Sequence, residues 1–189
     1  MRFVNKKKIK LDKIINELDK FVFKFIRILE KYTDYVIISG YVSILLGRSR
    51  STEDVDLFVK PINKITFVKL YKDLIKNKFW CLNAENVDEV YSYLQDGVAV
   101  RFAKKGTTVP NFEVKFAKKA LDLESFKDNI TVKTKIGEIK ISSLERQIAF
   151  KRYYLKSDKD IEDAEHIEEL FKGKLNKDLI KKYKRLIES

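Results

Sequence analysis

Two aspartates separated by one residue, Asp54 and Asp56, are the side chains whose types and spacing most directly predict chemistry in this sequence. The segment Asp54–Val59 alternates polar and apolar residues, which is typical of a half-buried strand, so both carboxylates face the same way. A strand rises about 3.3 Å per residue, which places the two residues roughly 6 to 7 Å apart, and their charges repel each other. A cation with hard oxygen ligands, such as Mg²⁺, relieves this repulsion.

A turn of small residues precedes the two aspartates. Residues 36–38 form a short β-branched run that predicts a strand, and Ser39-Gly40 interrupts this run where a helix begins. Gly40 has no Cβ and lets the backbone approach a ligand closely, and the free N–H groups at the start of a helix favour an anion. Phosphate is the anion that this turn predicts.

Polar side chains connect the predicted helix to the aspartates. Gly47 ends the helix, and Arg48, Arg50 and Thr52 follow it. Arginine binds phosphate oxygens through charge-assisted hydrogen bonds. A phosphate-binding turn beside paired carboxylates predicts Mg²⁺ carrying a nucleoside triphosphate. The alternative is that the aspartates are a solvated strand face.

A third carboxylate lies on the strand predicted over Asn111–Phe116. Its apolar residues face one way, and Glu113 and Lys115 face the other. Glu113 is therefore the best candidate for a third acidic group, and an exposed Glu113–Lys115 pair on an edge strand is the alternative. The weaker competitors are Glu85, Asp96 and Asp122.

Composition predicts one sizeable core and a polyanionic partner. The 189 residues are 44% hydrophobic, and 40 Lys and Arg against 28 Asp and Glu leave a net charge of +12. Such a charge favours RNA, DNA or a nucleotide, whereas a Lys-rich proteome is the alternative explanation. We expect a domain over residues 1–141 and a helical segment over residues 142–189 packed on it.

Both ends of the chain are basic. Residues 1–13 hold six Lys or Arg against one acidic residue, and residues 172–189 hold seven against two. If these ends flank the candidate site, they form a track that holds an RNA backbone. The alternative for the first stretch, which includes Lys6, Lys7 and Lys8, is a solvated helix end.

Hydrophobic periodicity predicts the remaining elements. Helices are expected over residues 10–32, 65–79 and 87–94, then after Ser142 or Ser143, from near Asp158, and over 176–187. A strand is expected over residues 98–102. Residues 130–134 and 138–141 are expected to form a hairpin with its turn at Gly137. The chain therefore mixes strands with helices and ends in a helical third.

The sequence disfavours several kinds of site. Cys81 is the single cysteine, so the chain cannot form an internal disulfide, and His166 has no Cys or second His near it for a zinc site. His166 is expected at the surface. Apolar stretches are far shorter than the ~20 residues that cross a bilayer, and no signal-peptide core follows the basic N-terminus. We expect a cytoplasmic protein with no membrane contact.

The order of these motifs resembles the DNA polymerase β-like nucleotidyltransferase superfamily. That superfamily combines a Gly-Gly or Gly-Ser turn, a helix and an Asp-x-Asp or Asp-x-Glu strand, here Ser39-Gly40 and Asp54-Val55-Asp56. The segment 47–57 is most similar to minimal nucleotidyltransferases and to nucleotidyltransferase toxins of toxin–antitoxin and abortive-infection systems. The resemblance implies an α+β (or α/β) fold: a nucleotidyltransferase-type mixed sheet flanked by helices, with a C-terminal helical segment.

The resemblance also implies the chemistry. Asp54 and Asp56 would hold two Mg²⁺ ions that carry the triphosphate, and Glu113 would help to activate the acceptor hydroxyl. Lys151, with the segment 159–163 after it, resembles a helical lysine close to the nucleotide phosphates; an exposed lysine is the alternative. Relatives act on RNA ends such as those of transfer RNA, on hydroxyls of a partner protein, or on small molecules. A catalytically silent, antitoxin-like or RNA-binding module is the alternative function.

Overall fold

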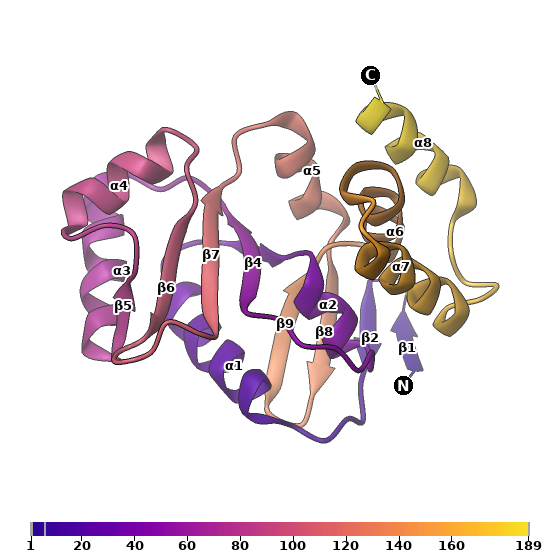
Figure 1. The fold of residues 1–189 in the computed structure, drawn as a ribbon, viewed down its shortest axis with the longest axis horizontal. Coiled ribbons are helices and arrows are strands. Elements are labelled where there is room, and N and C mark those ends of the chain that lie inside the picture. The colour runs from indigo at the N-terminus through magenta and orange to yellow at the C-terminus, as the bar shows by residue number, and fades with distance from the viewer. Residues whose placement is uncertain (1, 6, 189) are drawn as a thin grey trace.

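A mixed nine-stranded β-sheet runs the length of the molecule (Figure 1). The computed structural model describes residues 2–5 and 7–188, so Lys6, considered either as a phosphate contact or as part of a solvated helix end, lies outside the described residues. The strand order is β1-β2-β8-β9-β3-β4-β7-β6-β5. The strands are β1 (Arg2–Asn5), β2 (Lys8–Lys10), β3 (Tyr35–Ile37), β4 (Asp54–Val59), β5 (Phe79–Cys81), β6 (Val100–Lys104), β7 (Asn111–Phe116), β8 (Ile130–Thr134) and β9 (Gly137–Ile141).

Helices flank this sheet, as the sequence predicted. They are α1 (Glu17–Leu29), α2 (Gly40–Leu45), α3 (Lys64–Lys76), α4 (Val87–Gln95), α5 (Ala120–Asp128), α6 (Leu144–Phe150), α7 (Asp158–Leu170) and α8 (Lys177–Glu188), and one π-helical turn, η1 (Lys151–Leu155), extends α6. Figure 1 shows α3 and α4 at the end of the molecule that holds β5 and β6. The helices α6, α7 and α8 lie at the opposite end, where both chain termini also lie.

The core lies on one face of the central strands. The ring of Phe25 on α1 stacks on that of Phe112 on β7, with centroids 3.9 Å apart. Phe112 is fully buried, as are Val55 and Leu57 on β4. Because side chains alternate along a strand, burying these residues turns the polar residues between them to the other face. We call that other face, which carries Asp54, Asp56 and Glu113, the site face.

The beginning of α1 differs from the sequence prediction. A helix was expected over residues 10–32, but β2 forms at Lys8–Lys10 and α1 starts only at Glu17. β2 pairs with β8 in parallel, and the N–H of Leu11 donates to the carbonyl of Lys133 at 2.9 Å. Asn16 then caps α1 by accepting a hydrogen bond from the N–H of Asp19 at 2.8 Å. Sheet pairing with a distant segment thus overrides the local helical periodicity.

Besides β1 and β2, two elements were not predicted. The helix expected over residues 65–79 ends at Lys76, and Phe79–Cys81 forms the edge strand β5 against β6. The helix α5 was also missed, since its apolar periodicity is weak and one residue in it, Ser125, is buried. The hairpin of β8 and β9 forms as predicted, and Ser143 caps α6.

The C-terminal helices are tied to the rest of the chain by a buried arginine. Arg146 on α6 is 4% exposed, and its Nη2 lies 3.2 Å from both Asp128 Oδ2 and the hydroxyl of Tyr183 on α8. The division at residue 141 that the sequence predicts falls at the end of β9 and stays a prediction.

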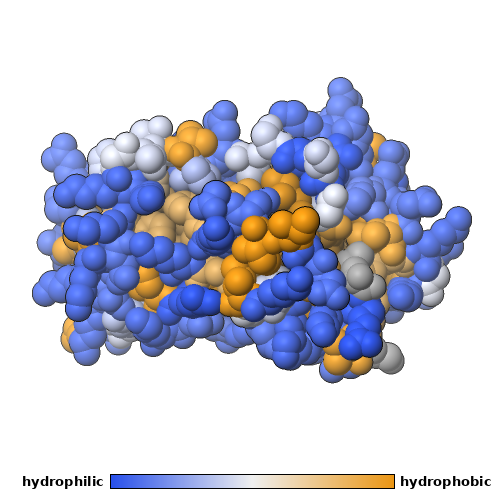
Figure 2. Space-filling model, turned by 90° about the horizontal axis from the view of Figure 1, so that it is seen from below, coloured by the Kyte–Doolittle hydropathy of each residue, from blue (hydrophilic) through white to orange (hydrophobic). Residues whose placement is uncertain are grey.

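Polar and charged side chains dominate the lower face of the molecule, with apolar side chains gathered near its centre (Figure 2). This surface agrees with a chain that is 36% charged. Within the described residues, the helices all fall short of the length and apolar character that a bilayer-spanning segment needs.

Candidate active site

Three carboxylates come together at the centre of the site face. β4 and β7 are parallel neighbours, and their register places Asp56 opposite Glu113 and Asp54 opposite Asn111. One carboxylate oxygen from each of Asp54, Asp56 and Glu113 lies within 4.8 Å of the other two. Each of the three residues is half-buried. The structure therefore brings together the three acidic residues that the sequence singled out, and we call them the carboxylate triad.

The triad concentrates negative charge that the protein neutralises only in part. Burial, followed by the charge of Asp54, raises the pKa of the Asp56 carboxyl to about 6, while a hydrogen bond from the Ser39 hydroxyl lowers it. Neither Asp54 nor Asp56 forms an ion pair within the described part of the chain. Converging oxygen ligands with uncompensated charge fit a hard divalent cation such as Mg²⁺.

An arginine that sequence reasoning missed holds the third carboxylate. Arg101 on β6 lies directly opposite Glu113 in the antiparallel pair of β6 and β7. Its Nε and Nη2 lie 3.2 and 3.1 Å from Glu113 Oε2. The alternating pattern of β6 places Arg101 on the site face, but the cross-strand register that pairs it with Glu113 cannot be read locally. β7 lies between β4 and β6 and Glu113 is half-buried, so the exposed Glu113–Lys115 pair on an edge strand, considered from sequence, is wrong.

The turn before α2 brings the backbone close to two side chains. Ser39 has a φ of 62° and a ψ of −139°, a conformation that a non-glycine residue adopts only under strain. A Cβ on Gly40 would lie 3.2 Å from Arg50 Nη2 and 3.4 Å from Thr52 Oγ1. Gly40 therefore makes room for two of the side chains that the sequence predicted to bind phosphate.

Tyr41, the residue after this turn, points away from the site. It is fully buried, and its hydroxyl donates to Asp19 Oδ1 at 2.9 Å. Its bulk thus fills the core beneath α2 and leaves the turn itself clear.

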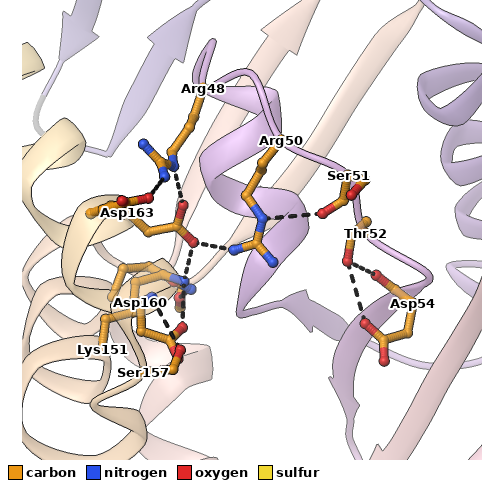
Figure 3. Close-up of polar contacts among 12 residues, drawn as sticks. Arg48, Arg50, Ser51, Thr52, Asp54, Lys151, Ser157, Asp160 and Asp163 are labelled. Carbon is orange, nitrogen blue, oxygen red and sulfur yellow. Dashed lines mark hydrogen bonds and ion pairs between the residues drawn. The ribbon is translucent and has the colours of Figure 1, made fainter.

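Thr52 fixes the first residue of the Asp-x-Asp strand. Its hydroxyl lies 2.9 Å from the backbone carbonyl of Asp54 and 3.4 Å from Oδ1 of the same residue (Figure 3). This local contact orients Asp54 as the chain enters β4.

The remaining candidate phosphate-binding cations surround a buried aspartate on α7. Arg48 Nε lies 2.7 Å from Asp163 Oδ1, and Arg50 Nη1 and Lys151 Nζ lie 2.5 and 2.8 Å from Oδ2 (Figure 3). Asp163 is fully buried and Lys151 is 1% exposed. We call these four residues the Asp163 cluster. Lys151 is thus not the exposed helical lysine considered as its alternative.

Asp163 was not assigned a role from sequence, although a signal for it exists. It lies on the inward face of α7 with Ala164 and Ile167, both fully buried. An acidic residue on the buried face of a helix needs a cationic partner, because an unpaired buried charge is costly. His166 on the same helix is half-buried, and its Nε2 lies 3.3 Å from the carbonyl of Leu46.

No protein-family model and no curated protein matches the sequence. Among solved structures, the chain is similar to an antigenic nucleotidyltransferase-like protein from Paracoccidioides brasiliensis, at 20% identity over 89% of this chain and 86% of that one, with a TM-score of 0.51. It is also similar to the antibiotic-resistance factor ANT(2'')-Ia, at 14% identity over 89% of this chain and 90% of that one, with a TM-score of 0.55. The fold that the sequence predicted is therefore confirmed: the chain has the mixed sheet and flanking helices of a nucleotidyltransferase fold.

Proposed function

We propose that the protein is a Mg²⁺-dependent nucleotidyltransferase. It transfers a nucleoside monophosphate from a nucleoside triphosphate to a hydroxyl of an acceptor and releases pyrophosphate. The observation that carries this proposal is the carboxylate triad, whose oxygens converge within 4.8 Å from two paired strands. The nucleotidyltransferase fold around the triad supports it.

Asp54, Asp56 and Glu113 would hold the metal, and we propose two ions. Bound Mg²⁺ neutralises the triphosphate and stabilises the attacking and leaving oxygens. The hydrogen bond from Ser39 favours the ionised form of Asp56, the form that binds a cation.

Glu113 is the proposed acceptor of the hydroxyl proton. As the acceptor oxygen bonds to the α-phosphorus, the bond from that phosphorus to the bridging oxygen breaks, and the proton leaves the attacking oxygen. Arg101 contacts Glu113 through Oε2, which leaves Oε1 to take this proton. Arg101 would therefore orient the carboxylate while leaving Oε1 free of this contact.

The phosphate-binding residues are proposed to be Ser39, Gly40, Arg48, Arg50, Thr52 and Lys151. Arg50 is best directed toward a phosphate, because its Nη1 binds Asp163 while its Nη2 lies next to the Gly40 turn. Arg48 binds Oδ1 of Asp163, and Lys151 binds the same Oδ2 as Arg50, so both hold that carboxylate in place for Arg50.

The segment 47–57 supports a place among the minimal nucleotidyltransferases or the nucleotidyltransferase toxins of toxin–antitoxin systems. The proposed donor is a cytoplasmic metabolite such as ATP, so we place the protein in the cytoplasm. The acceptor is the 3′ end of an RNA, including transfer RNA, or a hydroxyl of a partner protein.

A labelling experiment tests this function. The protein is incubated with each α-³²P-labelled nucleoside triphosphate, Mg²⁺, and total cell RNA and protein, and the labelled product is identified. Label should move to one acceptor class and should be lost with EDTA and in Asp54→Asn and Asp56→Asn. The exposed neighbour Glu53 provides the matched control, since Glu53→Gln should leave transfer unchanged. Nucleotide binding without transfer to any acceptor would instead support a silent binding module.

A further inference from the structure

Trp80 lies on the same face of the sheet as the carboxylate triad. It pairs with Ala103 on β6, Ala103 pairs with Asn111 on β7, and Asn111 pairs with Asp54 on β4. Residues directly opposite each other in neighbouring strands point to the same face, so this row connects the indole to the triad. Trp80 is 38% exposed, while its neighbours Phe79 and Cys81 face the core and are buried.

The indole is held in place at the surface. Its Nε1 donates to the carbonyl of Thr107 at 3.0 Å, in the loop that joins β6 to β7. Ala103 beside it is fully buried, although Arg101 and Asp54 on the same face are partly exposed. The small side chain of Ala103 lets a large ring lie close to the sheet. An exposed aromatic ring with a fixed position is a surface on which a planar group can stack without further ordering.

Two lysines without acidic partners lie at the end of the strand pair that carries this ring. Lys78 directly precedes β5 and Lys105 directly follows β6, the N–H of Lys105 donates to the carbonyl of Lys78 at 2.7 Å, and both residues are exposed. Lys104 pairs with Phe79 and therefore lies on the other face of the sheet. Across residues 2–5 and 7–188, the side chains of Lys78 and Lys105 make no ion pair or hydrogen bond. We call Trp80 with Lys78 and Lys105 the tryptophan platform.

The combination of a stacking ring and unpaired cations identifies the ligand by its chemistry. Single-stranded nucleic acids are bound by aromatic side chains that stack on bases and by basic side chains that contact the backbone. A protein acceptor that docks through apolar contacts would not use these cations, and a small molecule at the triad would not reach the ring. Resting on the function proposed above, we propose that the acceptor is a single-stranded polynucleotide whose 3′ hydroxyl lies at the triad and whose upstream base stacks on Trp80.

The spacing of the β-strands sets how many nucleotides must lie between the triad and Trp80. Three strand spacings of about 4.8 Å separate β5 from β4, so Trp80 lies roughly 14 Å from Asp54. About four stacked nucleotides at about 3.4 Å each cover this distance. The basic N-terminal strand β1 lies five positions from β4 in the sheet order, farther than the platform, and on the opposite side of it. The platform is therefore closer to the triad than the N-terminal part of the terminal track is.

Trp80 is the single tryptophan of the chain, which makes its fluorescence a reporter of the platform. Ten-nucleotide single-stranded RNA and DNA are titrated onto the full chain in EDTA without nucleoside triphosphate. Quenching by either polymer supports the proposal. The polymer that binds more tightly shows whether the acceptor is RNA or DNA. Absence of quenching by both, or equal quenching by a mononucleotide alone, would overturn it.

Variants are compared by the anisotropy of a fluorescein-labelled oligonucleotide. Trp80→Ala should weaken binding roughly ten- to a hundredfold, and Trp80→Phe, which keeps a stacking ring, should weaken it much less. Tyr154→Ala removes another exposed aromatic side chain, 67% exposed on η1, and should have no effect. Equal affinities for wild type and Trp80→Ala would overturn the platform. Thermal melting of each variant shows that it is folded.

Salt dependence tests the lysines separately. Removing Lys78 and Lys105 together should flatten the slope of log affinity against log salt by roughly 1.4, for two backbone contacts at about 0.7 each. The matched control removes Lys181 and Lys182 on α8, at the basic C-terminal end. Flattening in the control and not in the Lys78/Lys105 variant would show that the terminal track holds the nucleic acid instead.

The rate of transfer to acceptors of different length tests whether the platform takes part in the reaction. Trp80→Ala should lower kcat/KM for a six-nucleotide acceptor and leave a dinucleotide acceptor unaffected, because a dinucleotide cannot span to the ring. Binding in EDTA is independent of transfer, so the two proposals fail separately. Platform-dependent binding without transfer contradicts the enzyme, whereas transfer that is indifferent to Trp80 contradicts the platform.

Discussion

The carboxylate triad and the Asp163 cluster differ in how far their negative charge is neutralised by other side chains. Asp163 is fully buried and has three cations within 2.8 Å, from Arg48, Arg50 and Lys151. In the triad, three carboxylates crowd together, and Arg101 alone pairs with one of them in the described part of the chain. The charge of Asp163 is neutralised by side chains of the protein, whereas the triad needs a bound cation.

This difference teaches how to separate a structural charge from a functional one. A buried carboxylate that serves packing is neutralised by side chains, because an unpaired buried charge costs several kcal/mol. Carboxylates that repel one another need a ligand to compensate their charge. Burial first, and then repulsion by Asp54, raises the pKa of the Asp56 carboxyl. Removing a charge should therefore have opposite consequences in the two regions.

The largest expected effect is on activity at the triad. Asp54→Asn or Asp56→Asn should lower nucleotidyl transfer by a factor of roughly a thousand or more, since each removes a metal ligand. Single-turnover kinetics with a labelled nucleoside triphosphate measure the loss. A variant that keeps a tenth of the wild-type rate would show that its carboxylate is not a ligand.

A large loss of stability is expected at the Asp163 cluster. Asp163→Asn leaves Arg48, Arg50 and Lys151 without their shared anion, and we expect the free energy of unfolding to fall by about 3 kcal/mol. Chemical denaturation measures the change. Glu162→Gln is the matched control: Glu162 is 59% exposed and binds Arg48, so its loss should cost less than about 1 kcal/mol. Equal effects of the two substitutions would remove the distinction between the regions.

A smaller effect with the opposite sign is expected at Asp56. Its pKa of about 6 in the folded protein exceeds the unfolded value of about 4, so between these values the folded state binds more protons. In EDTA, the unfolding free energy should therefore rise by about 2 kcal/mol from this group as the pH falls from 7 to 4. Asp56→Asn removes that contribution, so the difference between wild type and variant isolates it. A difference that does not vary with pH would contradict the raised pKa.

The smallest effect concerns the turn at Ser39. Ser39→Gly relieves the strained backbone and should stabilise the fold by about 1 kcal/mol, whereas Ser39→Ala keeps the strain and loses the hydroxyl. Both variants remove the hydrogen bond to Asp56, so both should raise its pKa further. Thermal melting in EDTA at several pH values separates the two contributions. Equal stability of the two variants would show that the turn carries no strain.

Local patterns were sufficient to predict the triad. Alternation along Asp54–Val59 and Asn111–Phe116 fixes which residues share a face, and burial of the apolar residues then turns the carboxylates to the site face. The hairpin of β8 and β9 and the start of α7 were equally clear from local signals.

Features set by distant pairing could not be predicted in this way. β2 forms because residues 8–10 meet β8, far along the chain, and Arg101 meets Glu113 only through the register of β6 and β7. The Asp163 cluster joins α7 to the turn after α2 and to η1, so its ion pairs depend on how the helices pack. The sequence pointed to the three cations as candidate phosphate-binding residues but not to Asp163, the carboxylate that they share.

Nucleotide binding with and without Mg²⁺ tests the central claim most directly. A non-hydrolysable nucleoside triphosphate analogue is titrated calorimetrically onto wild type and onto a variant that carries both Asp54→Asn and Asp56→Asn. We predict that Mg²⁺ strengthens binding to wild type at least tenfold and has no such effect on the double variant. A wild type that binds equally well without Mg²⁺, or a double variant that keeps the full Mg²⁺ effect, would contradict a metal site at the triad.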